Sequence, residues 1–128
     1  MGYVWLKARI CNPIKREKYI EVEFLADSGA IYTAVPESLM KKIGVEEIGR
    51  GRFKLADGRV VEYPVGEAFI EIEGSGVTSI IAFLPEDATP ILGLTTLELM
   101  GLQVDPVTGK LKPLELYLLY NSNMFDHS

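Results

Sequence analysis

Phe24-Leu25-Ala26-Asp27-Ser28-Gly29-Ala30 is the most informative part of the sequence, because an apolar strand runs directly into a turn that carries a carboxylate. The residues that follow, Ile31 to Pro36, are again mostly apolar. A carboxylate on a tight turn just beyond a buried strand is held rigidly and faces outward, where a general acid or base belongs. Asp27 is therefore the candidate catalytic residue. By residue frequencies alone Asp-Ser-Gly occurs in roughly one chain in several tens of this length, so the residues around it are needed to support this assignment.

Short segments of alternating apolar residues make up most of the chain and predict a mostly β protein. Ile20, Val22 and Phe24, for example, are separated by single polar or acidic residues. Strands are expected over residues 3–10, 19–25, 52–55, 60–63, 68–73 and 77–84. Turn residues such as Asp57-Gly58 and Gly74-Ser75-Gly76 separate them. Strand and turn at such short intervals favour a closed or partly closed barrel over a parallel sheet.

Two short helices are expected to interrupt the strands. The first begins at Pro36, a residue suited to a first helical position, and ends at Gly44. The second covers Thr95 to Met100, where Thr95 and Glu98 have the spacing of a capping box and Gly101 can take the left-handed closing conformation.

The chain of 128 residues has the size of one domain, so residues 1–128 are expected to form a single domain, with the residues after about 121 disordered. The single cysteine, Cys11, excludes an internal disulfide framework, and without neighbouring thiols or histidines it predicts no metal site. His127, next to the C-terminus, is not expected to have a catalytic role.

The charge and the apolar runs limit the partners. A net charge of −5 argues against nucleic acid, which is bound by concentrated basic surfaces. The longest apolar run, Ile80 to Leu84, is too short to cross a bilayer, and the N-terminus does not have the pattern of a signal peptide. No membrane association and a cytoplasmic location are therefore expected.

The ordered set of motifs resembles the retropepsin-like aspartic proteases over nearly the whole chain. The family pattern is an apolar strand, Asp-Thr/Ser-Gly-Ala, a glycine-tipped flap hairpin, and then two apolar residues and a glycine before a short helix. The matching stretches here are Phe24 to Ala30, Leu55 to Arg59 and Ile91 to Leu94. The segment Gly101 to Leu111 is similar to the closing hairpin of the cellular and microbial members. The resemblance implies a retropepsin-like acid-protease barrel with one lobe per chain and no cofactor.

The resemblance also assigns roles to residues of this chain. Asp27 is the catalytic residue, and the active-site loop is Ser28, Gly29 and Ala30. The flap tip is Ala56, Asp57 and Gly58, where Asp57-Gly58 is expected to form a two-residue turn with positive φ at both positions. The substrate pocket is Ile91, Leu92 and Gly93, with Ile91 as a wall and Gly93 letting the catalytic loop pack closely.

The chain contains one Asp-Ser-Gly turn, whereas peptide hydrolysis by this route needs two carboxylates around one water. The partner of Asp27 is therefore expected to be Asp27 of a second copy, in a homodimer with a twofold axis through the active site. In many retroviral members an aspartate and an arginine form an ion pair that braces the dimer; the matching positions here are Ile31 and Leu94. The apolar segment Leu114 to Tyr120 is a candidate for part of the interface, or equally for a strand packed within its own subunit.

The leading hypothesis is an aspartic endopeptidase that cleaves an extended polypeptide substrate. A second hypothesis keeps the fold but makes it a catalytically weak or inactive module for peptide binding or dimerisation. In the resembled family the hydroxyl after the aspartate links the two turns across the axis, and Ser28 keeps this hydroxyl but does not have the methyl group of threonine. Together with the missing ion pair, this predicts a looser dimer. A third is an unrelated β-barrel in which Asp-Ser-Gly occurs by chance. Cleavage of a mixed peptide library by the wild type, but not by Asp27→Asn, separates the first from the others.

Overall fold

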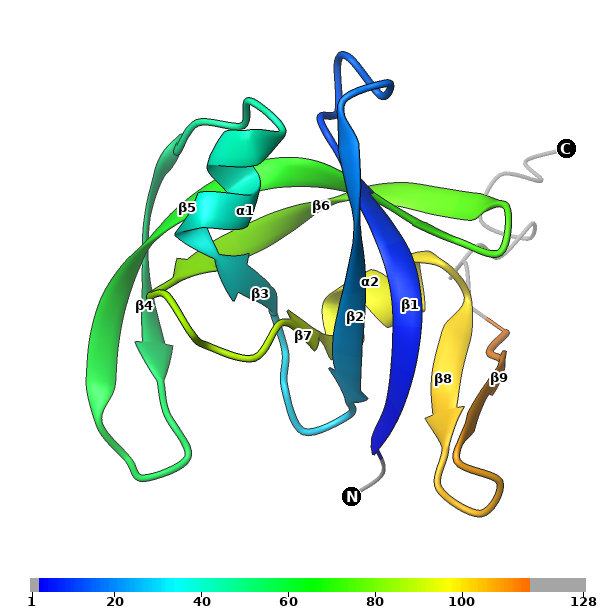
Figure 1. The fold of residues 1–128 in the computed structure, drawn as a ribbon. Coiled ribbons are helices and arrows are strands. Elements are labelled where there is room, and N and C mark those ends of the chain that lie inside the picture. Colours follow the sequence, from blue (N-terminus) through cyan, green and yellow to red (C-terminus); the bar gives the residue numbers. More distant parts are fainter. Residues whose placement is uncertain (1–2, 116–128) are drawn as a thin grey trace, which may run out of the picture.

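The computed structural model describes residues 3–115 (Figure 1). The predicted disorder after about residue 121, and the part of the predicted interface strand from Leu116 to Tyr120, lie outside the described residues. In chain order the elements are β1 (Tyr3–Cys11), β2 (Tyr19–Asp27), β3 (Thr33–Pro36), α1 (Glu37–Lys42), β4 (Gly49–Lys54), β5 (Val60–Ile72), β6 (Ser75–Leu84), β7 (Ile91–Leu92), α2 (Leu94–Leu99), β8 (Leu102–Asp105) and β9 (Lys110–Pro113). The predictions of a mostly β protein and of two short helices are confirmed.

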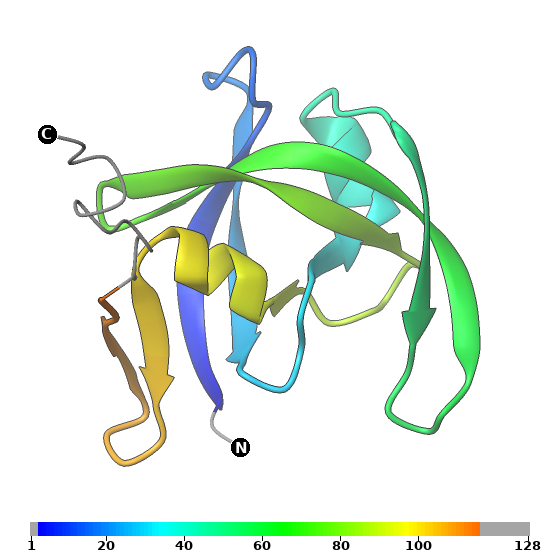
Figure 2. The same cartoon turned by 180° about the vertical axis from the view of Figure 1, so that it is seen from behind.

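Seven of the strands form one strongly curved sheet in the order β1-β2-β7-β3-β6-β5-β4. β1 also pairs with β5 through residues Arg9 to Cys11, so the sheet curls round into a partial ring (Figures 1 and 2). β8 and β9 form a separate two-stranded hairpin that follows α2 in the chain. Among the described residues, no helix is long and apolar enough to cross a membrane.

The core lies inside this ring and is built by the alternation in β1 and β2. The two strands pair antiparallel over nine residues each, and Val22, Phe24 and Ala26 point to the same buried face. Phe24 and Ile10 are fully buried. Burying one such large side chain contributes about 1.5–3 kcal/mol relative to leaving it in water. The core therefore fixes the strand that ends in Asp27.

β5 is a single strand of thirteen residues, so the prediction of two separate strands over 60–63 and 68–73 is wrong. Pro64 and Gly66 lie between the two predicted strands, and each fits within the single strand. Pro64 lies where β5 has β4 as its only described strand partner, a position in which its missing N–H is tolerated. Gly66 lies against Phe83: a Cβ there would come within 2.8 Å of the Phe83 ring.

α2 begins one residue earlier than predicted, and the capping box does not form. Gly93 occupies the N-cap position and no side chain caps the helix, while Thr95 is exposed within the first turn. Gly93 is required at this position by close packing, as described below, so a capping serine or threonine cannot take its place. Gly101 ends the helix with a φ of 69°, as predicted.

Candidate active site

Asp27 is the last residue of β2 and opens a tight turn. Its Oδ1 accepts a hydrogen bond from the backbone N–H of Gly29 at 2.8 Å, and its carbonyl accepts one from Ala30 at 3.1 Å. The Asp27 side chain is half-buried, Ser28 and Ala30 are half-buried, and Gly29 is exposed. The turn therefore holds the carboxylate in one orientation while leaving part of it open to solvent.

The start of α2 fixes the segment after this turn. The backbone N–H of Leu94 donates to the carbonyl of Ala30 at 2.7 Å, and that of Thr95 donates to the carbonyl of Ile31 at 3.0 Å. These bonds satisfy N–H groups that a helix leaves unpaired at its first turn. The loop of residues 27–32, called here the Asp27 loop, is thus attached to the first turn of α2.

Gly93 is the point of closest contact between these two segments. A Cβ at this position would come within 2.6 Å of the carbonyl oxygen of Ile31, and closer still to the backbone carbonyl group of Tyr32. Both atoms belong to the backbone and cannot rotate away, so only glycine fits. The expected close packing of Gly93 against the Asp27 loop is therefore present in the structure.

The backbone of Gly93 is hydrogen-bonded to a buried cluster of three hydroxyl groups. Thr33 Oγ1 accepts the backbone N–H of Gly93 at 2.9 Å and lies 2.6 Å from Thr96 Oγ1, which in turn lies 2.8 Å from Ser79 Oγ. All three side chains are buried, and they come from β3, β6 and α2. The sequence patterns do not predict this cluster: Ser79 and Thr96 each follow a threonine, and nothing in their spacing shows that they meet Thr33.

β7 lies between β2 and β3, where it pairs with Leu25 and Ala26 on one side and Ala34 on the other. This pairing brings the second predicted motif next to the Asp27 loop. Ile91 is half-buried, whereas Leu92 is fully buried in the core and Gly93 is buried under the loop. Of the three residues assigned to a substrate pocket, only Ile91 therefore keeps exposed side-chain surface.

The β4–β5 hairpin carries Ala56, Asp57 and Gly58, all exposed, at its tip. Gly58 N–H donates to the carbonyl of Leu55 at 2.9 Å, and Leu55 N–H donates to that of Arg59 at 2.8 Å. Gly58 has a φ of 89°, but Asp57 does not have positive φ. The predicted two-residue turn is therefore wrong: the connection is a three-residue loop that ends in a left-handed glycine.

The side chain of Asp57 explains this difference. Its Oδ1 accepts the backbone N–H of Arg59 at 3.0 Å, and its Oδ2 accepts Arg59 Nε at 2.7 Å. Through these bonds the Asp57 side chain stabilises the turn, as aspartate side chains commonly do by accepting a backbone N–H two residues later. The backbone bond from Arg59, followed by the side-chain bond, also lowers the pKa of Asp57 below its ordinary value of 3.8.

The Asp27 loop and the hairpin tip extend toward the same end of the molecule (Figures 1 and 2). They are joined by aromatic rings. Tyr32, in the loop, meets Phe53 of β4 edge to face, with ring centroids 5.3 Å apart and planes at 84°. Phe53 in turn stacks on Tyr63 of β5 at 6.3 Å.

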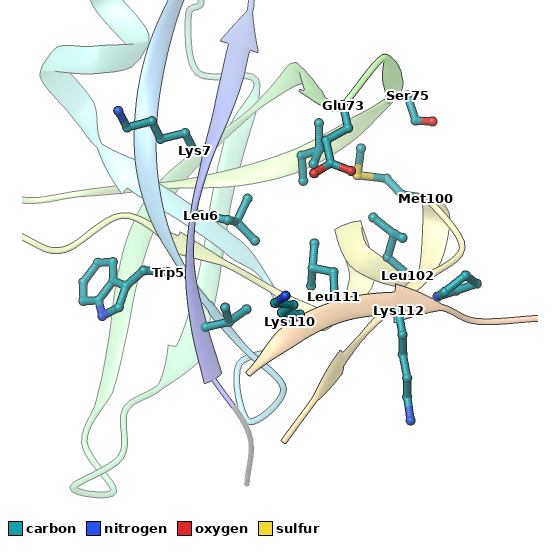
Figure 3. A pocket seen from close by; sticks show the side chains of 13 residues that line it. Trp5, Leu6, Lys7, Glu73, Ser75, Met100, Leu102, Lys110, Leu111 and Lys112 are labelled. Atoms are coloured by element: carbon teal, nitrogen blue, oxygen red, sulfur yellow. The ribbon is translucent and has the colours of Figure 1, made fainter. Parts of the chain in front are cut away.

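Two pockets lie elsewhere. One of about 660 Å³ is open to solvent and bordered by β1, the β5–β6 turn, the end of α2 and the β8–β9 hairpin, with Leu6, Met100, Leu102 and Leu111 around it (Figure 3). Another of about 480 Å³ lies beside α1. Neither of these two pockets includes a residue of the Asp27 loop or of the hairpin tip. Within residues 3–115, no group of three or more His, Cys, Asp or Glu side chains is placed to hold a metal ion.

Comparison with known proteins gives the family. The sequence model described as aspartyl protease matches residues 8–105. The chain belongs to the aspartyl protease family. The matched residues run from β1 to the end of β8 and include the Asp27 loop, the β4–β5 hairpin and Gly93. No curated protein matches the chain.

Solved structures with the same fold come from foamy viruses. The solution structure of the simian foamy virus (mac) protease matches with a TM-score of 0.52 and 21% identity, covering 73% of this chain and 91% of that one. The foamy viral protease-reverse transcriptase in complex with an RNA/DNA hybrid matches with a TM-score of 0.57 and 20% identity, covering 96% of this chain. The native prototype foamy virus protease-reverse transcriptase matches with a TM-score of 0.52 and 17% identity, covering 98% of this chain.

This chain spans 14% of the length of each of the two protease-reverse transcriptases. At these identities the likeness concerns the fold alone. The retropepsin-like resemblance drawn from the sequence motifs is confirmed by the family match and by these structures.

Proposed function

We propose that this member of the aspartyl protease family is an endopeptidase that hydrolyses peptide bonds of an extended polypeptide, with an active site formed by two Asp27 residues across a homodimer twofold axis. The observation that carries the proposal is the fixed Asp27 turn, which α2 holds through Ala30 and Ile31. One chain supplies one such carboxylate, and the reaction needs two. Symmetric pairing supplies the second without any further sequence signal.

In this mechanism the two Asp27 carboxyl groups share one proton, because two carboxyl groups so close together cannot both be ionised. The ionised group takes a proton from a water molecule while the protonated group donates its proton to the carbonyl oxygen of the peptide. The water oxygen bonds to the carbonyl carbon, and the carbon–nitrogen bond breaks once the leaving nitrogen has received a proton. The hydrogen bond from Gly29 N–H to Oδ1 orients each carboxylate for this exchange.

The β4–β5 hairpin serves as the flap in this proposal. Backbone groups of residues 56–58 and of the Asp27 loop pair with the substrate as an added strand, and closure of the flap excludes bulk water. Ile91 forms a wall for a substrate side chain, while Leu92 supports it from the core. Gly93 contributes by allowing the loop to pack, not by contact with substrate.

The proposed dimer has apolar residues at the positions where an ion pair braces many retroviral members. Ile31 is 55% exposed and Leu94 is half-buried at the positions where many retroviral members carry that pair. Apolar burial would therefore replace the charge contact. Ser28, half-buried beside Asp27, keeps the hydroxyl that the family uses to link the two turns.

The test is cleavage of a mixed peptide library from acidic to neutral pH by the wild type, Asp27→Asn and Asp105→Asn. Asp105 is a matched control, because its Oδ1 also accepts a backbone N–H two residues later, at 2.9 Å, and its role is turn formation. We expect Asp27→Asn to lose nearly all turnover while it folds as the wild type does, and Asp105→Asn to keep turnover. Undiminished turnover by Asp27→Asn would exclude the mechanism.

A binding module remains the second candidate, and the apolar Ile31 and Leu94 are the observation in its favour, since they remove a known brace of the catalytic dimer. The same assay separates the two functions. If neither the wild type nor Asp27→Asn cleaves any peptide, and both retain library peptides equally, the chain binds without cutting.

A further inference from the structure

The β4–β5 hairpin has one charged face and one aromatic face. Phe53 is paired with Val61 and Gly51 with Tyr63, so these four residues project to the same side. On the opposite side Arg50 Nε binds Glu62 Oε1 at 2.9 Å. Such alternation is typical of a strand pair with one face directed at other protein groups and the other directed at water. The aromatic face is the one that meets Tyr32.

Phe53 is positioned by the strand beneath it. A Cβ at Gly51 would come within 2.7 Å of Phe53 Cζ, so the ring lies across the surface left free by that glycine. The ring also stacks on Tyr63, with the planes inclined by 27°. Phe53 therefore presents its ring to Tyr32 in a defined orientation rather than as a loose side chain.

Tyr32 lies at the end of the Asp27 loop that is attached to the first turn of α2. Its backbone packs on Gly93, and the residue before it accepts the N–H of Thr95. Tyr32 as a whole residue is nevertheless 46% exposed, so its side chain can separate from Phe53 without opening the core. β4, by contrast, lies at the edge of the sheet and pairs with β5 alone among the described strands.

We propose that Tyr32, Phe53 and Tyr63 form an aromatic bridge that sets the resting position of the β4–β5 hairpin relative to the Asp27 loop. Edge-to-face and stacked ring pairs are directional, so they favour one position of the hairpin relative to the Asp27 loop. As far as catalysis is concerned, the inference depends on the proposed peptidase function. Tyr32 and Phe53 are then positioning residues. They hold the β4–β5 hairpin in the position that binds substrate, so that substrate binding does not have to order the hairpin.

The experiment uses Tyr32→Leu, which removes the ring, and Tyr32→Phe, which keeps it. Phe69→Leu is the matched control, because Phe69 lies on β5 beyond Tyr63 and its ring contacts Arg16 instead of the hairpin. Hydrogen exchange of the amides in residues 50–63 is measured first, because it requires no activity. We expect Tyr32→Leu to accelerate this exchange about two- to tenfold, the effect of losing one aromatic pair. Tyr32→Phe and Phe69→Leu should leave it as in the wild type.

Peptide cleavage is then compared for the same variants. We expect Tyr32→Leu to raise KM by up to that factor, with kcat and its pH profile unchanged, and Tyr32→Phe to have the wild-type KM. Unchanged exchange in Tyr32→Leu overturns the bridge whether or not the protein is a peptidase. Faster exchange with an unchanged KM overturns the positioning role alone. Absence of cleavage in the wild type contradicts the proposed function, while the exchange result still decides whether the bridge exists.

Discussion

At the scale of single residues, the conformation of the candidate site depends on one buried glycine, Gly93. Gly93 allows the Asp27 loop to approach α2 closely enough for Ala30 and Ile31 to accept the first N–H groups of the helix. A side chain would force the two segments apart, because the atoms it meets belong to the backbone. The position of the Asp27 carboxylate is thus linked to a residue 66 positions further along the chain.

Gly93→Ala should destabilise the protein by about 1–3 kcal/mol, the usual cost of overpacking, and should reduce any turnover by displacing the loop. Urea unfolding measures the first effect. Gly49→Ala is the control, because the nearest atom to a Cβ there is 4.0 Å away and its change in stability should stay within about 0.5 kcal/mol. Equal stability of Gly93→Ala and the wild type would show that the loop is not packed as described.

The buried hydroxyl cluster makes a second prediction at this scale. Thr96 Oγ1 contacts both Thr33 and Ser79, so Thr96→Val removes the partner of the buried Ser79 hydroxyl and leaves Thr33 Oγ1 with only the N–H of Gly93; it should cost about 1–3 kcal/mol. Thr95→Val, an exposed neighbour on the same helix, should be nearly neutral. Thermal or urea unfolding compares them. A cost for Thr95→Val as large as that for Thr96→Val would contradict the assignment.

At the scale of elements, the hairpin tip should respond to pH through Asp57. The bonds from Arg59 lower the pKa of Asp57 in the folded protein. The stabilisation that they give the hairpin tip is therefore fully present at a pH above the ordinary pKa of 3.8. It is lost only as the pH falls through the lowered folded-state pKa. NMR titration of the Asp57 carboxyl should therefore give a pKa below 3.8.

Arg59→Ala provides the control for that titration. The variant keeps the backbone N–H bond, the larger cause of the shift, and loses the guanidinium contact. Its Asp57 pKa should move toward 3.8 but stay below it. A wild-type pKa at or above 3.8 would mean that the tip does not have the hydrogen bonds described.

The elements also show where sequence reasoning succeeds and where it does not. Alternation located β1, β2 and β6 within a few residues, because one face of each strand is buried along much of its length. The alternation did not show that β5 continues through Pro64 and Gly66, because a strand tolerates these residues only according to which strands lie alongside and where the ring of Phe83 lies. The capping box failed for the same reason: Tyr32 requires a glycine at the N-cap, which local residue spacing does not reveal.

At the scale of the whole molecule, the order of the motifs was enough to predict the fold. Closure of the sheet was expected, but the pairing that produces it was not located, because β1 meets β5 through residues far apart in the sequence, such as Arg9 and Glu71. The same holds for the site. Asp27 and Gly93 were identified from motifs, whereas the hydroxyl cluster and the contact of Tyr32 with Phe53 arise only when distant segments pack together.

The central claim is that one active centre needs Asp27 from two chains. It is tested most directly by mixing wild type with Asp27→Asn, allowing subunits to exchange fully, and measuring peptide cleavage at constant total protein. At equal amounts, the account predicts about one quarter of the wild-type activity, because only one dimer in about four retains both carboxylates. An activity of about one half, falling in direct proportion to the wild-type fraction, would contradict it, because each chain would then act alone.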